Sequence, residues 1–475
     1  MVVNIILNIY KKKRRDILSS LAKNTALMTV VNLLMRIISV SFNAYLTSVI
    51  GSSGMGLFQL IMTVYGLAVT LSCAGIRLSA TRVITESSIG GKYDSKKTFN
   101  KCIEYVILFG IIASLILYFF SGFISDKFIG NINSVLPLKI LSVSLPFAAI
   151  NAAFSGYFTA KEQIPQYSVI LLTEQISKII IIIAILKSNP SFSSQNYPSV
   201  IVMGMTTAEI ISFILAKTFK SIVSAKTTSL PSIKMKEIFR IAFPDASGTL
   251  FRSLLLTVEH LMIPKGFEKS GENYKVSLSA YGNIHGIALP VILFPCAVLN
   301  SLSALIIPEL AKMKEYNNKE LINSTVRRNL KLTLFYSVIC SAVCFAAAPL
   351  LSNLIYKTNE AVQYIRILAP LVPVMYLDTV TDGMLKGLDK QFSSMIYNII
   401  DSLICVILVY FLLPVYSVKG YIFILYISEI INFALSFSKL ADTCEIRFRK
   451  ESSKETPMFS ERKQYSAFRR ACEYQ

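Results

Sequence analysis

Residues 24–50 read NTALMTVVNLLMRIISVSFNAYLTSVI, and residues 51–86 read GSSGMGLFQLIMTVYGLAVTLSCAGIRLSATRVITE. Each stretch supplies the roughly 20 apolar residues that a membrane-spanning helix needs. Arg36 lies inside the first stretch, where an arginine that faces lipid costs about 2.5–3.5 kcal/mol. The sequence therefore predicts two successive transmembrane helices, with Arg36 directed toward a cavity or a partner.

The remainder of the chain has the same apolar character. Of its 475 residues 53% are hydrophobic, and the mean hydropathy is +0.56, which is too apolar for a water-soluble globular protein. We therefore expect an all-α integral membrane protein with about twelve transmembrane helices, near residues 25–50, 55–80, 103–124, 135–160, 164–187, 198–219, 237–263, 278–308, 328–352, 361–388, 392–414 and 418–440.

The net charge of +20 follows the predicted topology. Lysine and arginine gather in the two terminal segments and in alternate loops. The opposite loops hold only Lys127, Lys187, Lys265, Lys269, Lys275, Lys357 and Lys419. This bias predicts that both termini are cytoplasmic. The surplus of positive charge is then explained by the orientation of the chain in the membrane and by attraction to anionic lipids, and it does not indicate nucleic-acid binding.

No catalytic or metal-binding pattern emerges. The eight cysteines form no CxxC pair, and His260 and His285, the only histidines, lack metal-ligand spacing. We expect satisfied histidines within helices. A phosphate-binding loop and a nucleophile motif are also missing from the sequence. We therefore predict a protein that is not an enzyme and that holds no cofactor or metal.

The second half of the chain repeats the first. LKIL at residues 138–141 returns as IRIL at 365–368, and EIISF at 209–213 returns as EIINF at 429–433. At the spacing of the first match, further positions correspond: Pro146 with Pro373, Gly156 with Gly383, and Glu174 with Asp401. Matches among proline, glycine and acidic positions indicate a duplication more strongly than matches among apolar ones.

Six spans in each half place both repeats in the membrane in the same orientation. This predicts a V-shaped, two-lobed transporter built from two parallel six-helix repeats. The expected segments are a basic cytoplasmic N-terminal segment (1–23), an N-lobe (24–219), a cytoplasmic inter-lobe linker (220–236), a C-lobe (237–440) and a basic cytoplasmic tail with little fixed structure (441–475).

Residues 54–86 resemble the start of the polysaccharide-flippase branch of the MATE-like (MOP) superfamily, which includes the lipid II flippases and their sporulation relatives. The likeness extends from residue 24 to about residue 440. It implies a transporter that carries undecaprenyl-linked sugars outward across the bacterial plasma membrane by alternating access. The chain departs from the lipid II flippases in two respects: Phe42 and Asn43 stand where those carry a second basic residue, and a basic tail replaces their last two helices.

Arg36 and Arg252 are the candidate substrate-binding residues, with Arg77 as a weaker third. Arg252 follows Leu-Phe in helix seven much as Arg36 follows Leu-Met in helix one. A guanidinium is planar, permanently charged and matched to phosphate oxygens, so these residues would bind the pyrophosphate of a lipid-linked glycan. The alternative is that they pack against local acids or carbonyl groups.

Five acidic residues are candidates for coupling transport to Na⁺ or H⁺: Asp378, Asp382, Asp401, Glu174 and Glu259. Asp378 and Asp382 lie four residues apart on one face of helix ten. The alternative for Glu174 and Asp401 is a structural role, with hydrogen bonds across helices within each lobe. Glu259, seven residues from Arg252, or Asp245 on its other side would screen that arginine when substrate is missing.

The sequence therefore predicts a flippase for an undecaprenyl-pyrophosphate-linked glycan, the peptidoglycan precursor lipid II first among them, with a role in the spore cortex. The alternative is a cation-coupled multidrug exporter of the MATE type, which the two arginines disfavour. A third reading is a scaffold in a cell-wall assembly complex. The expected partners are the lipid-linked substrate, membrane lipids and cell-wall synthesis enzymes, and a single chain suffices for a pathway.

Overall fold

The computed structural model describes residues 2–90, 93–188, 197–223, 230–315, 319–356 and 359–444, and for residues 2–26, 88–90, 222–223 and 354–356 it describes the helical backbone alone. Throughout these ranges the chain is helical and contains no strand. Nine described helical segments are long and apolar enough to cross a membrane. The prediction of an all-α, multi-pass membrane protein is confirmed for this part of the chain. The predicted tail beyond residue 444, part of the linker and the side chains of the N-terminal segment lie outside it.

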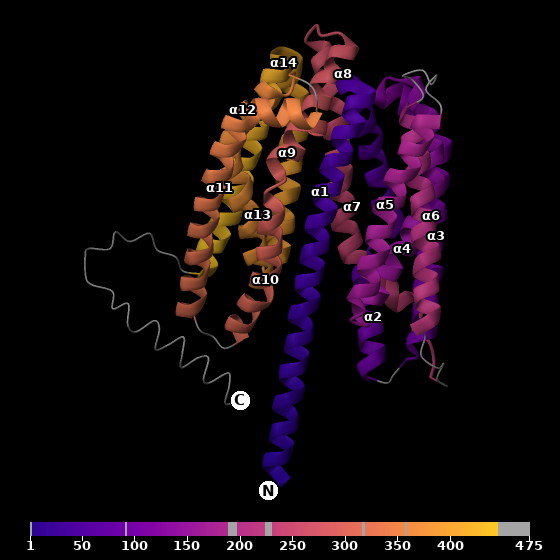
Figure 1. Cartoon of the computed structure of the whole chain (residues 1–475), viewed down its shortest axis with the longest axis vertical. Helices are drawn as coiled ribbons and strands as arrows, with labels where there is room; N and C mark the ends of the chain where they lie inside the picture. The colour runs from indigo at the N-terminus through magenta and orange to yellow at the C-terminus, as the bar shows by residue number, and fades with distance from the viewer. Residues whose placement is uncertain are drawn as a thin grey trace, which may run out of the picture.

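The first lobe ends in α6 and begins with a helix that turns back on itself. Gly51 has a φ of 71°, a left-handed conformation that glycine adopts without strain. After it, the chain returns toward α2 at the end of the bundle where the N-terminus lies (Figure 1). The helices are α1 (Val2–Cys73), α2 (Ile76–Gly90), α3 (Ser95–Phe123), α4 (Val135–Ala160), α5 (Ile164–Ser188) and α6 (Tyr197–Val223).

The second lobe ends in a similarly folded pair. Within its last helix, Ser417 has a φ of 49° and marks the turn between two membrane segments. The helices are α7 (Met235–Lys269), α8 (Tyr274–Gly282), α9 (Leu289–Leu293), α10 (Cys296–Glu315), α11 (Lys319–Tyr356), α12 (Val362–Leu368), α13 (Val372–Gly387) and α14 (Gln391–Cys444). The count of twelve crossings stays a prediction, because α7 and α13 are not among the nine segments selected by length and hydropathy.

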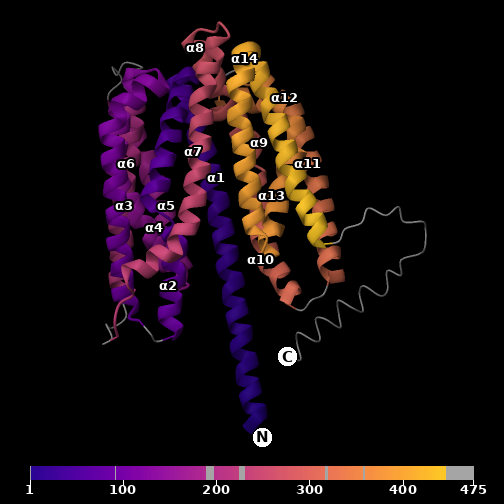
Figure 2. The ribbon, with the colours of Figure 1, turned by 180° about the vertical axis from the view of Figure 1, so that it is seen from behind.

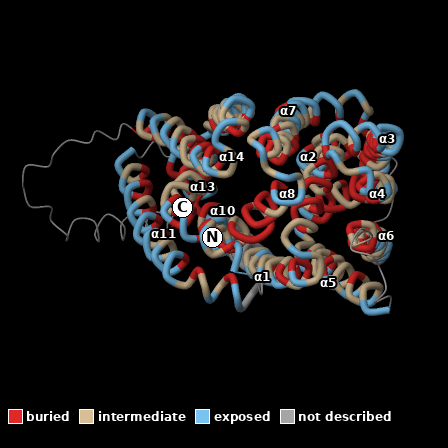
Figure 3. The backbone as a smooth tube through the Cα atoms, turned by 90° about the horizontal axis from the view of Figure 1, so that it is seen from above, coloured by how far each residue is buried: buried red, intermediate tan, exposed pale blue. Residues whose placement is uncertain are grey.

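The two lobes form the predicted V. They approach each other at one end, here called the distal end, and diverge toward the end that holds the N-terminus, here called the proximal end (Figures 1 and 2). Buried positions gather where α1, α8 and α10 meet, whereas outer helices such as α11 and α3 present exposed positions (Figure 3). Many of those exposed positions are large and apolar, such as Phe119 and Phe335, as expected for surfaces that contact lipid.

At the distal end the lobes touch through glycine. A Cβ on Gly56 of α1 would overlap the carbonyl oxygen of Leu278 in α8, and a Cβ on Gly282 of α8 would overlap the carbonyl oxygen of Ser52. Small residues allow this close approach of helices, which drives association where hydrophobic burial cannot. We call these four residues the distal contact.

The distal contact is symmetric. Gly56 lies four residues after Ser52, and Gly282 lies four residues after Leu278. The glycine of each four-residue strip, 52–56 or 278–282, therefore packs against the first residue of the other strip. The hydroxyls of Ser52 and Ser279, 227 positions apart, lie 2.6 Å from one another. The two glycines lie 226 positions apart, within one residue of the spacing of 227 that relates Glu174 to Asp401, so corresponding segments of the two repeats meet here. The internal two-fold axis therefore passes through the distal contact, as expected for parallel repeats.

The start of α7 packs with the first lobe. Ile238 and Ala242 are fully buried in the same apolar cluster as Ile76 of α2 and Phe99 of α3. Farther along α7, a Cβ on Gly266 would lie 2.6 Å from the Cβ of Leu413 in α14. The helix therefore contacts one lobe near its beginning and the other near its end, with Pro244 between the two regions. The exact boundary between the lobes stays a prediction.

Candidate functional site

Arg36 lies on α1 near the second lobe. Its Nε is buried and has no hydrogen-bond partner within the described residues. Its charge acts on the thiol of Cys296, the first residue of α10. A buried donor without an acceptor costs about 1–3 kcal/mol. A ligand that brings an acceptor to this nitrogen would remove that cost.

Arg252 and Arg77 differ from Arg36 in their surroundings. The side chain of Arg252, on α7, is exposed and acts electrostatically on Asp378 and Asp401. Arg77, in the first turn of α2, is also exposed. The described contacts join no two of the three arginines to each other, so the structure places them as separate positive groups on three helices.

Four acidic residues of the second lobe form a cluster, here called the acid cluster: Glu259 of α7, Asp378 of α13, and Asp401 and Glu429 of α14. Asp401 acts electrostatically on Glu259, and both aspartates act on Glu429. The amide of Asn432 donates to Asp378 Oδ2 at 3.1 Å, and Ser428 donates to Asp401 Oδ1 at 2.5 Å. Glu429, which lies in the repeated sequence EIINF, belongs to this group.

The acid cluster contains acceptor atoms that are not used. Asp378 Oδ1 and Asn432 Oδ1 are both buried and lack a hydrogen-bond partner in the described structure. Oxygen atoms of this type bind hard cations, and a carboxylate can alternatively take up a proton. Within the described residues no group of histidine, cysteine and acidic side chains is arranged to hold a metal ion, so any cation would share mixed carboxylate, amide and hydroxyl oxygens.

The first lobe repeats this arrangement with fewer charges. Asn151 of α4 donates to Glu209 Oε2 of α6 at 2.7 Å, and Ser212 donates to Glu174 Oε2 of α5 at 2.8 Å. Lys178 acts electrostatically on both glutamates. Glu174 and Asp401, equivalent in sequence, therefore each accept a hydrogen bond from a serine on the last part of their lobe. The second lobe alone combines four carboxylates.

Asp382 lies at the edge of the acid cluster. Lys386 Nζ approaches its Oδ2 to 2.5 Å, and Ser394 donates to its other oxygen. This local pairing neutralises Asp382, although its charge still acts on Asp378. Of the two aspartates predicted on one face of this helix, Asp378 is thus the one with a free acceptor oxygen.

The two histidines are neighbours, which their spacing in sequence did not reveal. His260 Nδ1 lies 2.7 Å from the hydroxyl of Tyr281, and His285 Nε2 lies 2.7 Å from the hydroxyl of Tyr421. The imidazole rings are 4.6 Å apart. Each histidine thus has a tyrosine partner: His260 joins α7 to α8, and His285, in the π-helical segment Asn283–Ala288 that follows α8, contacts α14.

A polar cluster accompanies the distal contact. The carboxylate of Glu360 accepts hydrogen bonds from Asn283 (2.9 Å), Ser52 (2.9 Å) and Ser279 (3.3 Å). These bonds, that of Asn283 first, lower the pKa of Glu360 below its ordinary value. Because Ser52 belongs to the first lobe and the others to the second, the cluster joins the lobes. Sequence reasoning missed it, since nothing local marks Glu360.

Known proteins share this architecture. The model of the family described as polysaccharide biosynthesis protein matches residues 21–314, which is more than half of the chain. The chain belongs to this family. The family model named MatE matches residues 274–411. Stage V sporulation protein B of Bacillus subtilis (strain 168) is 19% identical over 80% of this chain and 76% of its own length. Lipid II flippase MurJ of the same organism is 20% identical over 82% of this chain and 77% of its own length.

Solved structures show the same fold. A multidrug resistance MATE family transporter in an inward-facing conformation superposes with a TM-score of 0.68, 11% identity, and coverage of 90% of this chain and 100% of its own. Lipid II flippase MurJ in an inward closed conformation gives a TM-score of 0.68, 15% identity, and coverage of 87% of both chains. The polysaccharide biosynthesis family member described here therefore has the fold of these MOP-superfamily proteins, which are named as a transporter and a flippase and not as enzymes.

Proposed function

We propose that this protein is a flippase that exports an undecaprenyl-pyrophosphate-linked glycan by alternating access, with lipid II as its first candidate substrate. The relatives among sporulation proteins and the lipid II flippase support this choice. A role in the spore cortex is part of the same proposal, because two of these relatives are named for sporulation.

The observation that carries the proposal is the free guanidinium nitrogen of Arg36. It is buried, lacks an acceptor, and lies close enough to Cys296 for its charge to act across the lobe boundary. A pyrophosphate presents several charged acceptor oxygens, and hydrogen bonds between charged partners are about twice as strong as neutral ones. In the proposed cycle, Arg36 binds the pyrophosphate while the lobes are apart at the proximal end, and Arg252 and Arg77 supply further positive charge.

The acid cluster supplies the proposed coupling. A Na⁺ or H⁺ taken up by Asp378 or Asp401 would weaken the attraction of both aspartates for Arg252. Arg252 would then be available to the substrate. Glu259 and Glu429 add negative charge that favours cation binding, while Glu174 and Asp382 are already hydrogen-bonded or paired and are weaker candidates.

The orientation and setting complete the proposal. We place the protein in the bacterial plasma membrane with both termini cytoplasmic, because lysine and arginine concentrate in the loops on that side. The proximal end then opens to the cytoplasm, where lipid-linked precursors would enter. The proposed unit is a monomer, since one chain supplies both lobes, and cell-wall synthesis enzymes are its proposed partners.

A cation-coupled drug exporter is the second candidate. The MatE match over residues 274–411 covers Asp378 and Asp401, two of the four residues of the acid cluster, which favours this candidate. The decisive difference is the ligand: a drug exporter of this kind binds organic cations, whereas an arginine such as Arg36, whose buried Nε has no acceptor in the described residues, repels them and attracts phosphate.

Native mass spectrometry of purified protein with lipid II tests the proposal. The variants are Arg36→Ala, Arg252→Ala and Arg36→Lys, with Arg240→Ala as the matched control, because Arg240 is an exposed arginine on the same helix as Arg252. Loss of one charge-assisted contact of about 1.5–3 kcal/mol predicts about tenfold to hundredfold weaker binding for Arg36→Ala. Arg36→Lys should recover part of it.

Two results would reject the flippase. One is lipid II binding that is equal in the wild type, Arg36→Ala and Arg252→Ala. The other is binding of an organic cation such as ethidium that competes with lipid II and depends on Asp378 or Asp401. The second result would establish the drug exporter instead.

A further inference from the structure

The proximal beginning of α11 carries an unpaired basic cluster that the proposed transport cycle does not use. Arg327, Arg328 and Lys331 are exposed, and none forms an ion pair with a described carboxylate. They occupy the third and fourth turns of the helix, beyond its N-terminal turn, so their positions do not depend on the helix end. Among the described residues, therefore, no carboxylate competes with an external anion for these charges.

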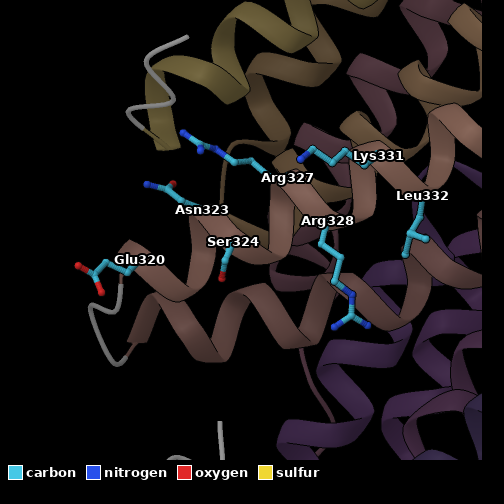
Figure 4. A pocket seen from close by; sticks show the side chains of 7 residues that line it. All are labelled: Glu320, Asn323, Ser324, Arg327, Arg328, Lys331 and Leu332. Carbon is cyan, nitrogen blue, oxygen red and sulfur yellow. The ribbon is translucent and has the colours of Figure 1, made fainter. Parts of the chain in front are cut away.

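These cations line a pocket of about 570 Å³. Arg327 and Lys331 extend to one side of α11, and Arg328 extends to the other (Figure 4). Asn323, Ser324 and Glu320 contribute further polar atoms, and Leu332 closes the pocket at its apolar end. Three cations against one carboxylate leave the pocket positively charged.

The position of this pocket along α11 matches the level of lipid head groups. Immediately after Lys331, residues 332–351 contain no charged residue. A helix of about 20 residues is about 30 Å long, which is the thickness of the hydrocarbon layer. The pocket therefore lies just outside that layer on the proximal side, where the phosphates of one leaflet are found.

An apolar surface continues from the pocket into the hydrocarbon layer. Leu332, Phe335 and Val338 are 52%, 70% and 51% exposed and follow one another at helical spacing along the outer side of α11. A ligand that fits the whole surface has a negatively charged head and a hydrocarbon tail. A soluble phosphate compound would use only the first half of it.

We propose that Arg327, Arg328 and Lys331 form a binding site for the phosphate of an anionic phospholipid of the proximal leaflet, whose acyl chains lie on the apolar outer surface of α11. Basic pockets at this level of a membrane protein bind anionic head groups. The site is distinct from that of the transported substrate, because α11 lies on the periphery of the second lobe (Figure 3) and Arg36 lies on α1. Occupancy would stabilise the proximal part of α11 at the membrane surface.

The test compares two triple variants of the full-length protein. Arg327→Gln/Arg328→Gln/Lys331→Gln removes the basic cluster, and Lys234→Gln/Lys236→Gln/Arg240→Gln removes three exposed cations from the beginning of α7 at the same end of the molecule. Native mass spectrometry measures the affinity for phosphatidylglycerol, with phosphatidylcholine as the uncharged comparison. Inorganic phosphate and undecaprenyl phosphate serve as competitors.

We expect the first triple variant to bind phosphatidylglycerol at least tenfold more weakly and the second to change its affinity less than about twofold. An equal loss of phosphatidylglycerol affinity in both variants would show that overall charge alone causes the binding, and it would overturn the proposed site. Phosphatidylcholine bound as tightly, or phosphatidylglycerol displaced by inorganic phosphate, would also overturn it. Preferential displacement by undecaprenyl phosphate would overturn it in favour of a substrate site.

Folding is checked independently. Both triple variants should melt at the same temperature as the wild type in detergent without lipid, and Arg327→Lys/Arg328→Lys should retain phosphatidylglycerol binding within a few-fold. If the lysine variant loses binding as fully as the glutamine variant, a charge-based phosphate site is excluded.

Discussion

Replacing Gly282 by alanine tests whether the lobes are held together through their backbones. A Cβ at this position would overlap the carbonyl oxygen of Ser52 and lie 2.7 Å from the amide nitrogen of Gly56. Backbone atoms cannot rotate away as a flexible side chain can. The two helices must therefore separate locally before alanine fits, and the distal contact must weaken.

The size of the effect follows from packing. Inserting a methyl group into a tightly packed position costs about 1–3 kcal/mol. The contact exists only when the lobes are joined distally, so the cost falls on that state and shifts the equilibrium toward the separated state by about fivefold to 150-fold. The preference of alanine over glycine for helix, about 0.8–1.0 kcal/mol, concerns folding and cancels between two states in which α8 is helical.

Electron–electron distance measurements in nanodiscs can report this shift. Spin labels at Asn133 and Asn359, exposed residues in the loops after α3 and α11, mark the distal ends of the two lobes. The eight cysteines of the chain would first be replaced. We expect Gly282→Ala to transfer population from the short to the long distance, and Gly56→Ala to do the same.

Gly66→Ala is the control. Gly66 lies in α1, the helix that contains Gly56, and a Cβ at this position meets nothing within 4 Å. It should leave the distance distribution unchanged. If Gly282→Ala also leaves it unchanged, the glycines do not control the approach of the lobes, and the reasoning from backbone overlap is refuted.

Three further results are expected. The lowered pKa of Glu360 means that its ionised form favours the joined lobes, so this contribution is complete above the ordinary pKa of 4.5 and is lost as pH falls through the lowered value. Glu360→Gln should remove the pH dependence of the distance between the spin labels. A pH dependence that persists in this variant would show that Glu360 is not its cause. Gly156→Ala, whose Cβ would lie 2.8 Å from the carbonyl oxygen of Arg77, should cost about 1–3 kcal/mol and lower the melting temperature, whereas Gly122→Ala, which meets no neighbour, should not. Asp401→Asn should abolish stimulation of lipid II transport by a Na⁺ or H⁺ gradient in proteoliposomes; undiminished stimulation would remove this residue from the coupling site.

The sequence allowed much of the fold to be predicted because the relevant signals are local or repeated. Long uncharged stretches identify spans, and the correspondence of Glu174 with Asp401 correctly indicated equivalent places in two lobes. Both residues accept hydrogen bonds from serines at corresponding helices. Matching pairs of this kind survive duplication, so they can be read from one sequence.

Contacts between elements far apart in sequence could not be predicted. Asp245 or Glu259 was predicted to screen Arg252, and that stays a prediction; nothing in the sequence indicated that Arg252 also acts on Asp378 and Asp401. Seven residues along a helix correspond to about 10 Å, which is farther than the separation across two packed helices. The approach of Glu360 to the opposite lobe depends in the same way on tertiary packing.

The symmetry of the distal contact bears on ancestry. A surface that contacts its own equivalent across a two-fold axis is self-complementary, so two identical copies can join through it without any further adaptation. A six-helix ancestor carrying one such strip would already have formed a closed homodimer in the membrane. Fusion of the two genes would then fix the pairing and free each half to diverge, so that Glu360, Glu259 and Asp378 could arise in one copy while Asp401 and Glu429 kept acidic counterparts in the other.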